Sequence, residues 1–115
     1  MNNIKLIVNN DSKKKDLEKF FIKNELQSIL NLYAKMVSNG SWKDYSFTTG
    51  IKEVSFNVYQ RASEKPVLRI LKNLKPKYFN ERYLIKDKNG AILKKSENLN
   101  QLISKTSWNK LKLIK

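Results

Sequence analysis

Residues 53–61 have the sequence EVSFNVYQR, in which apolar and polar side chains alternate. In an extended chain Val54, Phe56 and Val58 fall on one face, and the polar residues between them fall on the other. This alternation predicts a β-strand with one buried face, which is typical of antiparallel sheets. We therefore expect a sheet at the centre of the protein, and the sequence on either side of this stretch indicates what packs against it.

Further segments with strand-like composition are separated by turn residues. We predict strands at residues 42–48, 67–72, 82–86 and 91–95. The last two flank the sequence DKNG at residues 87–90, whose Asn-Gly pair predicts a type I′ hairpin turn. Residues 4–8 and 111–114 are candidates for two further short strands.

Residues 24–39 form the clearest predicted helix. Asn24 and Gln27 have the spacing of a capping box, and Gly40 stands where a left-handed residue would end the helix. The expected buried face follows the helical period and consists of Leu26, Ile29, Leu30, Tyr33, Met36 and Val37. A helix of this length is long enough to cover one face of the sheet.

The order of these elements predicts an α+β fold. We expect an antiparallel sheet of about five strands, with the long N-terminal helix packed on one face and a short C-terminal helix. The short helix is expected to be capped by Ser96 and to direct Leu99, Leu102 and Ile103 inward. A chain of 115 residues fits one domain, which we place at residues 20–115, with residues 1–19 as a mobile N-terminal extension.

Two blocks of residues have a distinctive spacing. The first contains Tyr33, Met36, Val37, Gly40, Trp42, Asp44 and Tyr45, and the second contains Phe56, Val58, Arg61, Ser63, Glu64, Pro66, Arg69, Ile70 and Lys72. With a weaker continuation through Tyr83 and residues 92–95 to Leu99, this pattern resembles DUF2794, a family of small alphaproteobacterial proteins of unknown function. The resemblance covers roughly residues 24–105, implies a compact domain and brings no established activity.

The chain has 24 basic and 10 acidic residues, a net charge of +14. Such an excess predicts an electrostatic partner, namely nucleic acid or another polyanion. Codon bias is the alternative, because 21 of the basic residues are Lys and only three are Arg, and Lys, like the abundant Asn and Ile, has A/T-rich codons. The charge is uneven, since residues 72–95 contain eight basic and two acidic residues.

We predict that the segment 72–95 binds nucleic acid, with RNA or single strands favoured over sequence-specific duplex DNA. Its cationic residues are Lys72, Lys75, Lys77, Arg82, Lys86, Lys88, Lys94 and Lys95, and its stacking candidates are Tyr78, Phe79 and Tyr83. Arg82, Lys86 and Lys94 are expected to approach one another on neighbouring strands. Like charges side by side cost stability unless a polyanion neutralises them, which favours an anionic partner.

Two other functions stay open. The first is a protein-interaction module or homodimer, formed through an open sheet edge and the apolar segments 4–8 and 20–22. The second is a small anionic ligand held by Arg61 and Arg69, although an ion pair between Arg61 and Glu64 in a rigid loop is the preferred interpretation there. Trp42 is a stacking candidate, but a core position that seals the helix against the sheet is preferred.

The residue types that are absent from the sequence restrict its chemistry. The chain has no His and no Cys, which excludes Ser-His-Asp and Cys-His catalysis and thiolate metal sites. Its three glycines are far apart, so it contains no glycine-rich phosphate loop. We therefore expect a protein without enzymatic activity, metal or cofactor. No apolar run approaches the roughly 18 residues of a membrane span, and the N-terminus lacks a cleavage-site pattern, so we expect a cytoplasmic protein.

Overall fold

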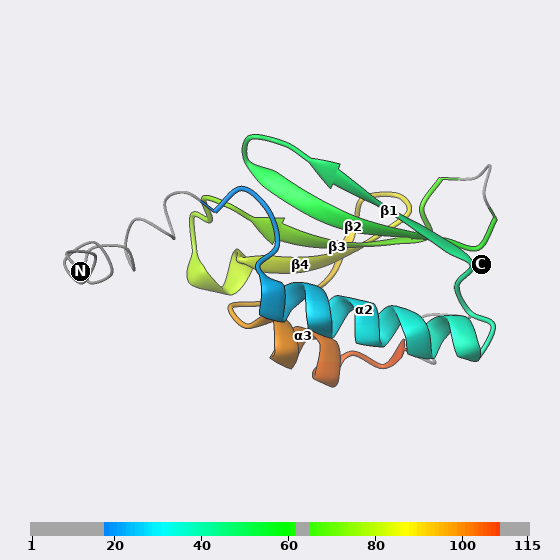
Figure 1. Cartoon of the computed structure of the whole chain (residues 1–115). Coiled ribbons are helices and arrows are strands. Elements are labelled where there is room, and N and C mark those ends of the chain that lie inside the picture. Colours follow the sequence, from blue (N-terminus) through cyan, green and yellow to red (C-terminus); the bar gives the residue numbers. More distant parts are fainter. Residues whose placement is uncertain (1–17, 62–64, 109–115) are drawn as a thin grey trace, which may run out of the picture.

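The computed structural model describes residues 18–61 and 65–108 (Figure 1). The elements follow in the order α2 (Lys23–Ser38), β1 (Asp44–Thr49), β2 (Glu53–Tyr59), β3 (Leu68–Asn73), the 3-10 helix η1 (Phe79–Glu81), β4 (Tyr83–Asp87), β5 (Ile92–Ser96) and α3 (Leu99–Lys105). This arrangement confirms the predicted α+β fold with five antiparallel strands and two helices. The candidate strands at 4–8 and 111–114, and most of the predicted extension 1–19, lie outside the described residues.

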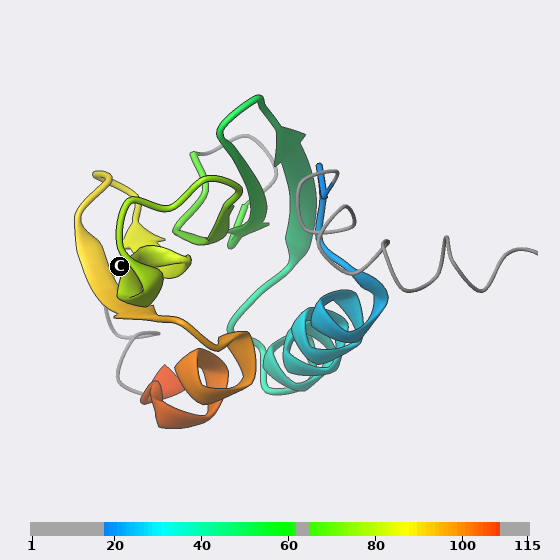
Figure 2. The ribbon, with the colours of Figure 1, turned by 90° about the vertical axis from the view of Figure 1, so that its left-hand side faces the viewer.

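The five strands lie side by side in chain order, and every neighbouring pair is antiparallel. Figure 2 shows the sheet curving from β1 to β5, with α2 and α3 on its open side. We call the face toward the helices the inner face and the opposite one the outer face. Among the described residues, no helix is long and apolar enough to cross a membrane.

The inner face contains the alternation from which the sheet was predicted. Phe47, Phe56, Ile70 and Ile85 are directly opposite one another across β1 to β4. The last three are at most 1% exposed, and they belong to the same apolar cluster as Ile29 and Met36 of α2. Trp42 is also buried in this cluster, as the preferred interpretation predicted.

The buried face of α2 differs from the predicted one. Leu30 and Val37 are each 40% exposed, whereas Leu32, which was not predicted to be buried, is 5% exposed. The reason is the neighbouring helix, because α3 packs beside α2 and the Ser28 hydroxyl donates to the Asn100 side chain at 2.6 Å. Helical spacing marks an apolar stripe, but it does not reveal that a second helix covers the positions next to it.

The end of α2 was predicted correctly and its start was not. Gly40 has φ +83°, and the N–H groups of Gly40 and Ser41 donate to the carbonyls of Val37 and Met36, which is the Schellman pattern. The helix begins at Lys23, before the predicted cap Asn24. There the Glu25 carboxylate accepts the backbone N–H of Ile22 at 2.8 Å.

The turn between β4 and β5 and the start of α3 also differ from the predictions. Gly90 has φ +87°, but no described non-glycine residue has a positive φ, so the predicted type I′ turn is wrong. The Asp87 carboxylate accepts the N–H groups of Asn89 and Ala91 and stabilises a different turn. Asn98, not Ser96, caps α3 by accepting the Gln101 N–H.

Candidate functional site

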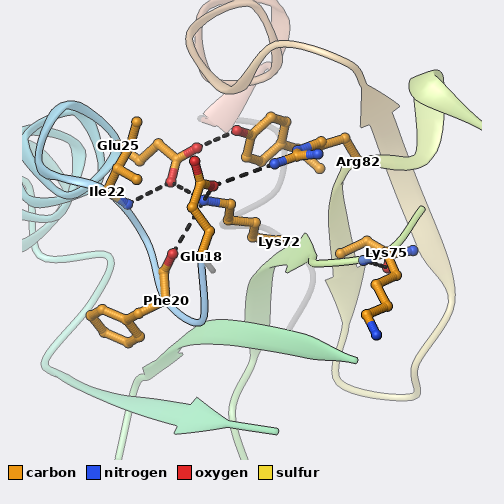
Figure 3. A network of polar contacts seen from close by, with 9 residues as sticks. Glu18, Phe20, Ile22, Glu25, Lys72, Lys75 and Arg82 are labelled. Atoms are coloured by element: carbon orange, nitrogen blue, oxygen red, sulfur yellow. Dashed lines mark hydrogen bonds and ion pairs between the residues drawn. The ribbon is translucent and has the colours of Figure 1, made fainter. Parts of the chain in front are cut away.

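Lys72 lies in the interior of the protein, although it belongs to the predicted basic surface. It stands on β3 between Val54 and Tyr83 of the neighbouring strands, on the inner face, and its side chain is 0% exposed. Its Nζ donates to Glu18 Oε1 at 2.5 Å, to Glu25 Oε1 at 2.9 Å and to the carbonyl of Phe20 at 3.1 Å (Figure 3). All three donors of the ammonium group therefore have acceptors, as a buried lysine requires.

Glu25 joins the first turn of α2 to the start of β4. One of its carboxylate oxygens accepts from Lys72 and from the Ile22 N–H, and the other accepts the hydroxyl of Tyr83. Burial, followed by the hydrogen bond to Glu25 and its negative charge, raises the pKa of the Tyr83 hydroxyl above its usual value. Tyr83 is therefore a neutral donor at neutral pH.

Arg82 completes this group, because its Nη2 lies 3.4 Å from Glu18 Oε1. We call Glu18, Glu25, Lys72, Arg82 and Tyr83 the Lys72 cluster. It contains two cations and two carboxylates, so its charges balance. Both carboxylates are engaged by cations, which leaves neither as an unengaged general base.

The Lys72 cluster corrects the predicted nucleic-acid surface. Lys72 and Tyr83 are buried, so they are not part of a surface along which a phosphate backbone could lie or on which a base could stack. The expected approach of Arg82, Lys86 and Lys94 is also wrong. Arg82 turns toward Glu18, Lys86 is opposite Arg69, and Lys94 is opposite Ile85.

Basic residues are neighbours on the outer face, in a different combination. Asn57, Arg69 and Lys86 are successive cross-strand partners on β2, β3 and β4, and Lys95 of β5 ends the next row, opposite Leu84. Arg69 and Lys95 are exposed and Lys86 is partly exposed. We call Arg69, Lys86 and Lys95 the basic outer face. We predicted that Arg69 binds an anion together with Arg61. Its position two residues before Leu71, whose cross-strand partner is Leu84, would have placed it on the outer face.

Two aromatic side chains protrude next to this face. Tyr78 is 58% exposed and Phe79 is 79% exposed, and Lys77 Nζ lies 5.8 Å from the centre of the Tyr78 ring. Glu81 Oε2 is 3.9 Å from Lys95 Nζ, which places η1 beside β5. We call residues 74–81 the aromatic loop. Tyr78, a predicted stacking residue, is thus accessible, as is the neighbouring Phe79.

The remaining predicted residues are spread over the surface. Lys75, Lys77, Lys88 and Lys94 are exposed. Arg61 and Arg69, the predicted anion-binding pair, are both exposed, and Arg69 is opposite Asn57 and Lys86 rather than opposite Arg61. Ser63 and Glu64 of the same loop lie outside the described residues. Within 18–61 and 65–108 no three acidic side chains are grouped as a metal site would need.

Comparison with known proteins identifies a family without an assigned activity. The family model described as "Protein of unknown function (DUF2794)" matches residues 19–103. This span includes the Lys72 cluster apart from Glu18, the basic outer face and the aromatic loop. No curated protein and no solved structure matches the chain.

Proposed function

Since the chain belongs to the DUF2794 family, whose description assigns no activity, we propose from its surface chemistry that it binds single-stranded nucleic acid, above all RNA, without catalysing a reaction. The proposed interface consists of the aromatic loop and the basic outer face. Cytoplasmic RNA is the partner that this proposal favours.

The observation that supports the proposal best is the exposure of Tyr78 and Phe79 among cations. Two adjacent aromatic rings at 58% and 79% exposure leave much apolar surface in water. Proteins that bind single strands stack unpaired bases on such rings, and flanking lysines hold the phosphates. Lys75 and Lys77 lie on the same loop, so the aromatic loop combines both kinds of contact.

The charges on this side of the molecule favour the same partner. Arg69 and Lys86 are direct cross-strand neighbours, and like charges in that position repel each other unless an anion lies between them. The two acids of segment 72–95 do little to neutralise Arg69 and Lys86, because Asp87 bonds its own turn and Glu81 pairs with Lys95. A phosphate backbone would supply the missing negative charge.

A protein-interaction module or homodimer is the second candidate. Among the described strands β1 and β5 form the edges of the sheet, and Ile92 on β5 is 53% exposed. Lys94 and Lys95 on the same strand oppose pairing with a second positively charged edge. Light scattering at low and high salt separates the candidates, because a dimer that persists in high salt favours this one.

The proposal is tested by fluorescence anisotropy with a 12-nucleotide oligouridine. We expect binding that weakens steeply between about 50 and 200 mM salt, because phosphate contacts release counterions. Phe79→Ala should weaken binding about tenfold, since stacking contributes roughly 1–3 kcal/mol per base. Leu30→Ala on α2 is the matched control, because it removes an exposed apolar side chain from the opposite side of the sheet.

Charge reversal distinguishes the proposed interface from general attraction. Arg69→Glu should weaken binding far more than Lys35→Glu, which changes the same charge on an exposed position of α2. Equal losses in the two variants, or unchanged binding by Phe79→Ala, would show that the net charge alone attracts the oligonucleotide, and the proposed interface would be rejected.

A further inference from the structure

The carboxylate of Glu18 is held as a bound anion would be held. Its Oε1 lies 2.5 Å from Lys72 Nζ and 3.4 Å from Arg82 Nη2, and Figure 3 shows it between these two side chains. An ammonium and a guanidinium that converge on one oxygen anion are the groups with which proteins bind phosphate and carboxylate ligands. Here the anion is supplied by the chain itself.

Without Glu18 this place would need another anion. Lys72 would then keep its ion pair with Glu25, but Arg82 would lose its ion pair with Glu18, which leaves one positive charge in excess beside the fully buried Lys72. An uncompensated charge in the interior is strongly unfavourable, so the two cations would attract a replacement of the same charge.

A groove opens directly beside Glu18. It has a volume of about 340 Å³ and is lined by Glu18, Lys19, Gly50, Ile51, Leu74 and Lys75. Lys19 and Lys75 are exposed, so two cations stand at the entrance. Glu18 therefore belongs both to the wall of this groove and to the buried Lys72 cluster.

The segment that holds Glu18 is also anchored by Phe20 and Phe21, which follow Glu18 in the chain. Phe21 is 4% exposed and belongs to the core, and Phe20 packs against Phe47 with ring centres 5.1 Å apart. Lys19, which lies between Glu18 and Phe20, is exposed. Displacement of the Glu18 carboxylate therefore does not require Phe20 and Phe21 to leave their positions.

We propose that Lys72 and Arg82 form an anion site that Glu18 occupies in the free protein, and that a phosphate group entering through the groove replaces the Glu18 carboxylate. The oxygens of the phosphate group replace the Glu18 carboxylate as acceptors for Lys72 and Arg82. Lys19 and Lys75, which line the groove, attract the phosphate group to it. The groove shares Leu74 and Lys75 with the aromatic loop, but Lys72 and Arg82, which hold the anion, are not part of the proposed nucleic-acid interface, so either proposal can fail alone. The phosphate can come from a small phosphorylated molecule or from the end of a nucleic acid.

The test uses inorganic phosphate and the full chain at constant ionic strength. Amide NMR should show that phosphate shifts the signals of residues 18–22, Lys72 and Arg82. Glu18→Gln removes the competing carboxylate and should tighten phosphate binding about tenfold. Glu97→Gln is the matched control, because it removes the same charge from an exposed residue outside the groove.

Further variants decide the result. Arg82→Gln added to Glu18→Gln should abolish the gain, and if Glu18→Gln is poorly folded, phosphate should raise its melting temperature more than that of Glu97→Gln. In Glu18→Gln a 5′-phosphorylated oligonucleotide that binds better than the unphosphorylated one identifies a nucleic-acid end as the source, and equal binding identifies a small molecule. Equal phosphate affinity and equal stabilisation of the Glu18→Gln and Glu97→Gln variants would overturn the proposal.

Discussion

Lys72 and Lys95 belong to the same basic stretch of sequence and have opposite environments. Lys72 is 0% exposed and has three acceptors within 3.1 Å, whereas the Lys95 side chain is 48% exposed and has one contact, at 3.9 Å. The two strands lie in one sheet, but Lys72 is on the inner face and Lys95 on the outer face. For these two lysines, the face that each occupies, and not the local density of charge, determines whether the lysine stabilises the fold or remains available to a partner.

The comparison also shows how an apolar core accommodates a charge. Lys72 lies near one end of β3, opposite Val54, while Ile70 on the same face is within the apolar cluster. At that end the segment before α2 brings Glu18 and the first turn of α2 brings Glu25. The ammonium group is buried only because segments distant in sequence place carboxylates around it.

Substitution of Lys72 should have the largest effect. Lys72→Met leaves the Glu25 carboxylate without its cation and leaves Glu18 with Arg82 alone, so we expect the free energy of unfolding to fall by about 3–5 kcal/mol. Urea denaturation followed by circular dichroism measures the loss. A drop below 1 kcal/mol would mean that the cluster contributes little to stability.

A matched variant identifies the cause of that loss. If the unpaired charges are responsible, Lys72→Met combined with Glu18→Gln and Glu25→Gln should be less destabilised than Lys72→Met alone, because no buried carboxylate is then left without a cation. Equal or greater destabilisation would assign the loss to packing around the lysine side chain instead.

Tyr83 allows the same region to be examined by pH. Its pKa is raised above the usual 10.0 in the folded protein, first by burial and then by Glu25, so the folded state favours the neutral hydroxyl. This contribution is complete below pH 10, and it is lost as the pH rises further because the unfolded chain releases its proton first.

Tyr83→Phe removes the hydroxyl and should lower the free energy of unfolding by about 1–3 kcal/mol near neutral pH, because Glu25 loses a donor. The difference between wild type and variant should shrink between about pH 10 and pH 11.5. Denaturation curves of both proteins at pH 8 and pH 11 measure it. A difference that stays constant across this range would contradict the raised pKa.

Much of the fold follows from the alternation of residues along the chain. The strand at 53–61 was predicted because apolar and polar residues alternate, although the polar Ser55 and Asn57 are buried as well, and Gly40 was predicted to end α2 because only glycine adopts its left-handed backbone readily. The buried face of α2 was not predicted fully, because the position of α3 beside Leu32 is a tertiary contact. The predicted type I′ turn between β4 and β5 was wrong, because the Asp87 side chain stabilises another turn.

The candidate site was less predictable, because its residues are brought together by tertiary contacts. Tyr78 was correctly expected to be a surface aromatic residue, since it lies in a loop among lysines. The alternation that placed Val54 inside would also have placed Lys72 inside once the register of β2 and β3 was known, but the sequence does not state that register. Glu18 and Glu25 became visible as partners of Lys72 only in three dimensions.

Lys95→Met should have the smallest effect on the free energy of unfolding. It is compared directly with Lys72→Met, because both variants replace a lysine of the same sheet by methionine. Its contact with Glu81 is long and solvent-exposed, so the free energy of unfolding should change by less than about 0.5 kcal/mol. In the proposed function the same side chain contacts phosphate, so oligonucleotide affinity should fall and its salt dependence should decrease by about one counterion. The same substitution, made separately at Lys72 and at Lys95, would then distinguish a charge that stabilises the fold from a charge that binds a partner. A Lys95→Met variant that unfolds as readily as Lys72→Met would refute this separation, because solvent screening could not account for it.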